Sequence, residues 1–233
     1  MASHAERERL GGWKRMWEFD EIDFHNEQVH QTLIEYLDRL GPCGKPANIF
    51  VPLCGKSLDV KWLADQGVQT VGLDGVHKAL EQFYTEHGLD WEETNVPALG
   101  GAGKLLSSKD GRLKLYCGDI TDFTVEVGGC FDAVWDRAAV VALNREDVER
   151  YVQIMKGLVR PGGCILLESE EFEASDFDGI TDVLLKLPPP HAMFEDEIRR
   201  LYEPEFTVKP LSRSLRKVGE NSVHDVMYLL RKN

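Results

Sequence analysis

Apolar residues recur along the chain at two spacings, which together predict an alternation of strands and helices. Short apolar runs typical of buried strands occupy residues 48–53, 69–73, 113–117, 131–135 and 164–168. Apolar residues three and four positions apart predict helices over residues 57–66, 76–87 and 144–157. We expect Gly67 and Gly88 to end the first two helices, because glycine adopts the left-handed C-cap at least cost. This alternation favours an open, mostly parallel sheet with helices on both faces.

The segments that flank this alternation predict further elements. Residues 26–40 carry a helical periodicity that ends before the first strand. Residues 89–111 are rich in Gly, Ser and Pro and predict a loop with room for an extra hairpin. A helix over 195–202 precedes two β-like runs, 206–210 and 223–231. Because no helix separates these runs, we expect an antiparallel strand pair at the sheet edge.

The first 25 residues are polar yet carry four large aromatic residues, Trp13, Trp17, Phe19 and Phe24. That content is too high for a purely disordered tail, so we expect residues 1–25 to form an arm that packs on the rest of the protein. No internal repeat and no long linker divides residues 26–233, which we expect to form a single domain.

Composition narrows the class of partner. Lys plus Arg is 27 and Asp plus Glu is 40, so the formal charge of −13 disfavours nucleic acid. The five cysteines lack C-x-x-C spacing, as is typical of thiols in a reducing compartment. No apolar run approaches the roughly 18–20 residues that span a bilayer, and the N-terminus lacks the apolar stretch of a signal peptide. We therefore expect a soluble cytoplasmic protein without a membrane partner, and a monomer.

Ligands of open α/β sheets bind at the carboxyl ends of the strands, near the point where strand order reverses. After the first predicted strand, the sequence FVPLCGKS places Gly55 at a sharp turn, where backbone can approach a ligand or simply reverse direction. Asp74 ends the second strand, 19 positions later (74 − 55), about the spacing at which an acid reaches ribose hydroxyls. Aspartate also caps helices often, but the two residues together favour a nucleoside site.

Two further pairs follow the third and fourth strands. Asp119 and Ile120 could present an acceptor atom and an apolar face to an adenine ring, or Asp119 could be a solvated loop acid. Asp136 and Arg137 directly follow an apolar strand. They could pair with each other, but their position at the carboxyl edge favours contact with a ligand.

Several motifs of other enzyme classes are absent from the sequence. It has no G-x-S-x-G elbow, no H-E-x-x-H and no P-loop, which disfavours hydrolase, zinc-protease and NTPase activities. A nicotinamide-dependent oxidoreductase would need a three-glycine turn after the first strand, where this chain has only Gly55. His25, His30, His77 and His87 are interpreted as solvated or hydrogen-bonded residues, and we predict no metal site.

Four stretches resemble the thiopurine S-methyltransferase family: VPLCGKSLDVKWLADQG, LYCGDI, WDR and MYLLRK. The resemblance covers nearly the whole chain and includes the pattern Trp13-x-x-x-Trp17 and the stretch PPPH…EIRRLY. It implies a Rossmann-like class I methyltransferase fold, S-adenosylmethionine as cofactor, a small aromatic or heterocyclic thiol as substrate, and a role in xenobiotic metabolism.

The resemblance also implies roles for individual residues. In the family, the residues matching Trp13, Trp17 and Phe24 cover the cofactor and the adjoining substrate pocket. Leu53 and Gly55 would line the methionine part, Asp74 would hold the ribose, and Asp119 with Ile120 would flank the adenine. Arg137 would lie beside the methionine carboxylate or the acceptor, with Asp136 orienting it.

The sequence departs from the family pattern at three places. Asp74 replaces the expected glutamate, and Asp119 stands where serine is usual. The loop before the last strand is shortened, which leaves Arg213 and Arg216 as alternative candidates for the substrate arginine.

The implied mechanism is direct in-line methyl transfer without a covalent enzyme intermediate, in which alignment supplies about 7–11 kcal/mol of barrier lowering. An arginine near the acceptor could favour its anionic form. Two alternatives remain: a methyltransferase for halide, hydrosulfide, selenium or tellurium nucleophiles, and a noncatalytic protein that binds S-adenosylmethionine. The aromatic arm favours a flat organic acceptor.

Overall fold

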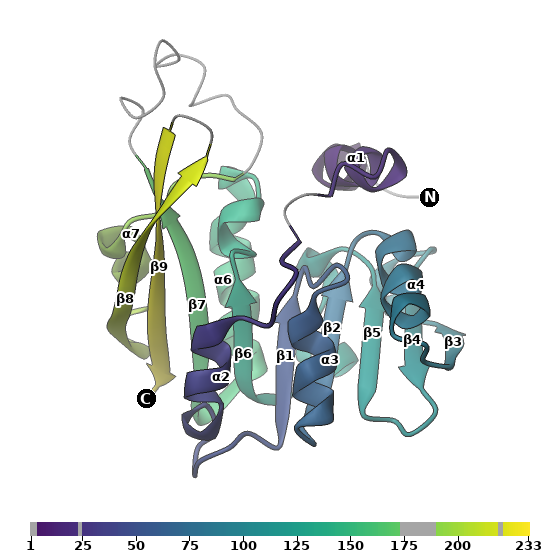
Figure 1. Ribbon diagram of the computed structural model, residues 1–233, viewed down its shortest axis with the longest axis horizontal. Coiled ribbons are helices and arrows are strands. Elements are labelled where there is room, and N and C mark those ends of the chain that lie inside the picture. Colours follow the sequence, from purple (N-terminus) through teal and green to yellow (C-terminus); the bar gives the residue numbers. More distant parts are fainter. Residues whose placement is uncertain (1–3, 23–24, 173–189, 219–220) are drawn as a thin grey trace.

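The computed structural model describes residues 4–22, 25–172, 190–218 and 221–233. Its centre is a nine-stranded sheet in the order β3-β4-β5-β2-β1-β6-β7-β9-β8 (Figure 1). The five central strands are parallel: β1 (Asn48–Pro52), β2 (Gln69–Asp74), β5 (Leu113–Cys117), β6 (Phe131–Arg137) and β7 (Val159–Glu171). The two edges are antiparallel hairpins: β3 (Trp91–Asn95) with β4 (Lys104–Ser108), and β8 (Phe206–Val218) with β9 (Asn221–Lys232). The predicted open, mostly parallel sheet with helices on both faces, and the antiparallel strand pair at its C-terminal edge, are confirmed.

Helices cover both faces of the sheet, each over its own hydrophobic cluster (Figure 1). One face carries α2 (Gln31–Tyr36), α3 (Leu58–Asp65) and α4 (His77–Glu86). The other carries α6 (Val148–Leu158) and α7 (Glu195–Tyr202). The short helix α5 (Val125–Gly128) lies in a connection. So do the 3-10 turns of the described residues: Leu37–Arg39, Pro97–Leu99, Ile120–Asp122, Val140–Ala142 and Arg145–Asp147.

Strand order reverses at β1, which pairs with β2 on one side and β6 on the other. From β1 the chain proceeds outward to β2 and β5, and later returns to add β6 and β7 on the opposite side. The helix α1 (His4–Glu18) lies beyond the carboxyl ends of these parallel strands (Figure 1). The topology therefore places the arm over the edge where open α/β sheets bind ligands.

The structure differs from the sequence prediction mainly at element ends. The first helix, expected over 26–40, begins only at Gln31, because the ring of His30 caps it and the backbone N–H of His30 donates to Asp59. The region 89–111 does contain the extra hairpin, β3 with β4. The last two strands are longer than predicted, because β8 and β9 continue to pair through polar residues. Within the described ranges, no helix combines the length and apolar character needed to cross a bilayer.

Asp59, on α3, connects this helix to the start of α2 and to β6 through hydrogen bonds. Its buried carboxylate accepts the backbone N–H of His30 at 2.8 Å and the indole N–H of Trp135 at 2.8 Å. It thereby ties the start of α2 and the end of β6 to α3. Since a buried donor that loses its acceptor costs about 1–3 kcal/mol, this residue matters for the whole edge.

We expect Asp59→Ala to lower the free energy of unfolding by about 2–3 kcal/mol, because it leaves the buried indole N–H of Trp135 and the partly buried N–H of His30 without their acceptor. Asp65→Ala is the matched control on the same helix, since it removes only an exposed pair with Lys61 and should cost less than about 0.5 kcal/mol. Urea unfolding of the three proteins measures both values. Equal losses in the two variants would contradict this role of Asp59.

Candidate functional site

A cavity opens at the carboxyl edge of the sheet, between the ends of β1, β2 and β6 and the helix α1. Residues from three strands and the arm therefore share one space, as the topology predicts. Of the residues singled out from the sequence, six line this cavity: Trp13, Trp17, Leu53, Gly55, Asp74 and Arg137. Phe24, expected at the same place, lies outside the described residues.

The turn after β1 has an unusual backbone. Leu53 and Gly55 both adopt left-handed conformations, with φ of 46° and 50°. A side chain at position 55 would place its Cβ 2.5 Å from His25 Cε1 and 3.3 Å from Trp17 Cζ2. Glycine therefore adopts the left-handed angle at position 55 at the least cost, and it leaves room for His25 and Trp17 to approach the turn closely.

Asp74 holds this turn from the neighbouring strand. One carboxylate oxygen accepts the Gly55 N–H at 2.8 Å and the other accepts the Val76 N–H at 2.9 Å. Burial raises the pKa of Asp74 to about 6, although these backbone hydrogen bonds oppose the shift. Each oxygen keeps a further lone pair, so the residue can hold its own loops and still accept from a ligand hydroxyl.

The arm is anchored on the start of α4. Trp17 is 2% exposed and packs with Val76 and Ala79, and the half-buried Trp13 lies against the same cluster. Lys78 Nζ also donates to the Trp17 carbonyl at 2.7 Å. These contacts hold one wall of the cavity in place.

His25 closes the cavity against the turn. Its ring meets the Trp17 ring edge-on, with centroids 5.1 Å apart. Burial, followed by the charges of Arg137 and Lys56, lowers the pKa of His25 to about 4. The ring is therefore neutral at physiological pH, and protonating it would oppose the packing of the arm.

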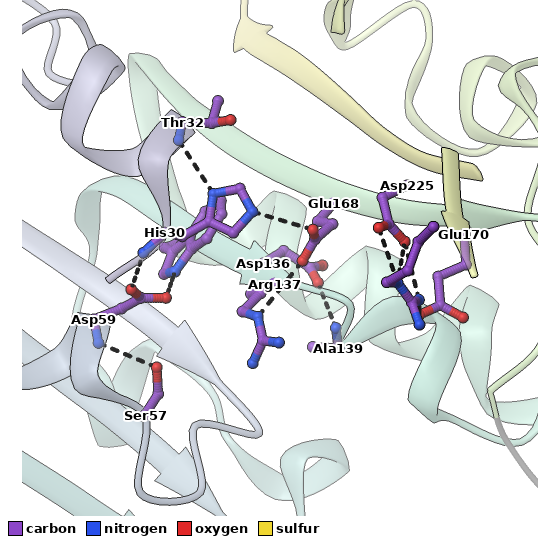
Figure 2. Close-up of polar contacts among 12 residues, drawn as sticks. His30, Thr32, Ser57, Asp59, Asp136, Arg137, Ala139, Glu168, Glu170 and Asp225 are labelled. Carbon is purple, nitrogen blue, oxygen red and sulfur yellow. Dashed lines mark hydrogen bonds and ion pairs between the residues drawn. The ribbon is translucent and has the colours of Figure 1, made fainter. Parts of the chain in front are cut away.

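Arg137 emerges from the end of β6 beside a carboxylate of β7. Its Nε lies 3.6 Å from Glu168 Oε2, and Glu168 Oε1 lies 3.2 Å from His30 Nε2 (Figure 2). Burial raises the pKa of Glu168, but the hydrogen bond from His30 and the charge of Arg137 outweigh it, so the net pKa lies below the ordinary value. Glu168 is thus ionised and pairs with the cavity arginine.

Asp136 points to the opposite face of the sheet from Arg137, as adjacent strand residues do. It is fully buried and accepts the N–H groups of Ala139 and Val140 and the hydroxyl of Tyr151, at 3.0, 3.2 and 2.7 Å. Burial raises its pKa to about 6. Asp136 therefore anchors the loop after β6, and Glu168 occupies the place beside Arg137 that the sequence analysis gave to Asp136.

Asp119 and Ile120 follow β5, the strand next to β2. Asp119 is buried and its carboxylate accepts the Thr121 N–H at 2.9 Å, while Ile120 packs in the core. Neither lines the cavity formed by the described residues. Their contact with an adenine ring remains a prediction.

The two candidate arginines of β8 both pair with acids at the end of β7 or on β9. Arg216 lies 2.7 Å from Glu170 and 2.9 Å from Asp225, whereas Arg213 lies 3.1 Å from Glu171. Glu170 itself lines the cavity. Arg216 is thus connected to the cavity wall through Glu170, and a direct substrate contact remains a prediction.

Sequence reasoning missed three site residues. The sequence predicts a solvated or hydrogen-bonded histidine at position 25, whereas His25 lines the cavity. Glu168 and Glu170 end the last parallel strand in LLESEE, and acids at that position follow the same signal that identified Asp136 and Arg137. That signal, applied to the fifth strand, would have found both.

We expect the stability that His25 contributes to fall as pH drops. The native pKa of about 4 lies below the ordinary 6.5, so between these values the unfolded chain takes up a proton that the native chain excludes. The contribution of His25 to the free energy of unfolding is therefore complete above pH 6.5 and is lost as the pH falls toward 4. The loss is about 1–2 kcal/mol, because the ring is only partly buried.

Urea unfolding of the wild type and His25→Gln between pH 7.5 and 4.5 measures this effect. The stability advantage of the wild type should shrink as pH falls, while Asp74 and Asp136 titrate in both proteins and cancel in the difference. Parallel pH profiles for the two proteins would refute the assignment.

The chain is similar to known proteins over most of its length. The thiopurine S-methyltransferase family model matches residues 8–227. The thiopurine S-methyltransferase of Bos taurus is 34% identical over 203 residues, covering 86% of this chain and 79% of the relative. The probable thiopurine S-methyltransferase of Danio rerio is 32% identical and covers 99% of this chain and 98% of the relative. The Pseudomonas fluorescens thiopurine S-methyltransferase is 35% identical, covering 81% and 78%.

Solved structures agree on the fold. The 1,6-didemethyltoxoflavin-N1-methyltransferase of Burkholderia thailandensis, with S-adenosylhomocysteine bound, has a TM-score of 0.66 at 14% identity and covers 100% of this chain and 91% of that chain. A methyltransferase of Methanosarcina mazei that depends on S-adenosylmethionine has a TM-score of 0.61 at 13% identity, covering 88% and 98%. At these identities the likeness concerns the fold alone.

Proposed function

Because this chain belongs to the thiopurine S-methyltransferase family, and is therefore a methyltransferase that depends on S-adenosylmethionine, we propose that it methylates small aromatic or heterocyclic thiols. The observation that carries the proposal is the cavity in which the Gly55 turn, Asp74, the aromatic arm and Arg137 meet. Trp13 and Trp17 give this cavity flat apolar surfaces suited to a ring.

The residues present fit the cofactor. The turn at Leu53 and Gly55 leaves backbone accessible for the methionine part, and Asp74 retains lone pairs for the ribose hydroxyls. Asp119 and Ile120 follow the strand beside β2, where an adenine would extend from that ribose. The arm, with Phe24, would cover the bound molecule. When bound, S-adenosylmethionine supplies a methyl group already activated on a sulfonium.

The chain's own residues are then needed for alignment. The arm and the wall formed by Trp135, Ala138 and Ala139 would hold the acceptor sulfur in line with the methyl group and exclude water. Arg137 carries five N–H donors, of which Nε faces Glu168, and we assign it to the junction of the methionine carboxylate and the acceptor. The transfer is direct and forms no covalent enzyme intermediate.

Composition and the state of the cysteines support a proposal about substrate type and cellular compartment. A net charge of −13 supports a small-molecule substrate over nucleic acid. Cys54, Cys117 and Cys164 are buried as free thiols, which is typical of a reducing compartment. We therefore propose a monomeric cytoplasmic enzyme of xenobiotic metabolism, with residues 1–25 as an arm over the single domain 26–233.

The proposal is tested by methyl transfer from S-adenosylmethionine to pyridine-2-thione, with the S-methyl product identified by mass spectrometry. We expect turnover by the wild type and a fall in kcat/KM of about 10- to 100-fold in Arg137→Ala, the loss of a charged hydrogen-bond donor. Lys61→Ala removes a cation at the surface and should leave kcat/KM unchanged. If no aromatic or heterocyclic thiol is methylated, the proposed substrate class is wrong, and if Arg137→Ala behaves as wild type, so is the role of Arg137.

A further inference from the structure

One end of the cavity, lined by Arg137 and Glu170 and called the acceptor end below, contains more negative charge than a site for anions should have. Glu168 and Glu170 lie two positions apart on β7, so they project from the same face of the sheet (Figure 2). Glu170 lines the cavity directly, and Glu168 contacts the cavity residue Arg137. Both side chains are largely buried, 12% and 15% exposed, so solvent screens them weakly.

His30 holds Glu168 in place beside Arg137. Its ring Nδ1 accepts the backbone N–H of Thr32 at 3.2 Å, and its Nε2 lies 3.2 Å from Glu168 Oε1. The backbone N–H of the same residue donates to Asp59. These contacts fix the position of the Glu168 carboxylate.

The second arginine is also compensated. Arg216 pairs with both Glu170 and Asp225, at 2.7 and 2.9 Å. Among the described residues of this group, two guanidinium groups thus face three carboxylates, Glu168, Glu170 and Asp225, a balance of 2 − 3 = −1. His25, at the cofactor side, is neutral because burial lowers its pKa to about 4.

From this arrangement we propose that the site takes uncharged acceptors, such as heterocyclic thiones, and discriminates against anionic ones, with Glu168 and Glu170 as the specificity-determining residues. The inference rests on the proposed function, because it assumes that the acceptor occupies this end of the cavity. The inference distinguishes among the alternative acceptors. Halide, hydrosulfide and carboxylated thiols all carry a negative charge, which Glu168 and Glu170 would repel.

The charge flow of the reaction supports the same assignment. As the bond between the thione sulfur and the methyl carbon forms, the bond between that carbon and the donor sulfur breaks. The positive charge therefore moves from the donor sulfur to the heterocycle, and it is removed when the ring N–H proton leaves to solvent. Fixed carboxylates at the acceptor end stabilise that developing positive charge, whereas an anionic acceptor develops none.

Two probes of equal shape test the charge preference: pyridine-2-thione-3-carboxamide, which is neutral at pH 7.5, and pyridine-2-thione-3-carboxylate, which is anionic. Isothermal titration measures the affinity of each for the protein saturated with S-adenosylhomocysteine, so the result does not depend on turnover. We expect the wild type to bind the carboxamide at least about tenfold more tightly, since one net charge at short range in a partly buried site is worth that much.

Glu168→Gln keeps the shape of the side chain and removes its charge. We expect this variant to lower the ratio of carboxamide affinity to carboxylate affinity about tenfold. Glu170→Gln should shift the ratio in the same direction, which guards against a local rearrangement in either variant alone. Glu149→Gln removes a charge from the exposed face of α6 and should leave the ratio unchanged. A thermal unfolding scan checks that each variant is folded.

The outcomes are distinguishable. Equal binding of the two probes to the wild type, binding of neither, or an unchanged ratio in both Glu168→Gln and Glu170→Gln would overturn the inference. If the affinities follow the expected order but neither probe is methylated on sulfur, charge selection stands and the S-methyltransferase proposal fails. Methylation of the carboxamide together with a narrowed ratio in the variants supports both.

Discussion

The buried carboxylate of Asp74 is the constraint on which the site depends. It ends β2, next to the strand at which strand order reverses, and it accepts one N–H from the turn after β1 and one from the turn into α4. Burial raises the pKa of Asp74 to about 6, and a buried carboxylate is costly unless hydrogen-bond donors surround it. The two backbone N–H groups that donate to Asp74 bring their turns together, and the left-handed turn at Gly55 leaves room for the arm.

Asp136 and Arg137 are adjacent on β6, so their side chains project from opposite faces of the sheet and make different contacts. Asp136 faces the α6 side, where it binds Tyr151 and the loop that follows β6. Arg137 faces the cavity and Glu168. One strand thus fixes the loop on one side and presents a cation on the other, and Trp135, on the same face as Arg137, is tied to α3 by its bond to Asp59.

Much of the fold could be predicted from local patterns, because buried strands and amphipathic helices have distinct periods. Gly55 and Asp74 were predictable too, since turn chemistry and spacing along the chain point to them. The pairing of Arg137 with Glu168 was not, although Glu168 follows the same strand-end signal: the two residues are 31 positions apart (168 − 137), and only strand pairing brings them side by side. The late start of α2 at Gln31 has the same cause, since the bond from His30 to Asp59 spans 29 positions and overrides local helical periodicity.

The central claim is that Asp74 organises a cofactor site, and isothermal titration with S-adenosylhomocysteine tests it most directly. The account predicts binding by the wild type, a loss of affinity of tenfold or more in Asp74→Ala, about the value of one charged hydrogen bond, and unchanged affinity in the exposed control Asp65→Ala. A folded Asp74→Ala variant that binds as tightly as the wild type, or a wild type that does not bind at all, would contradict it.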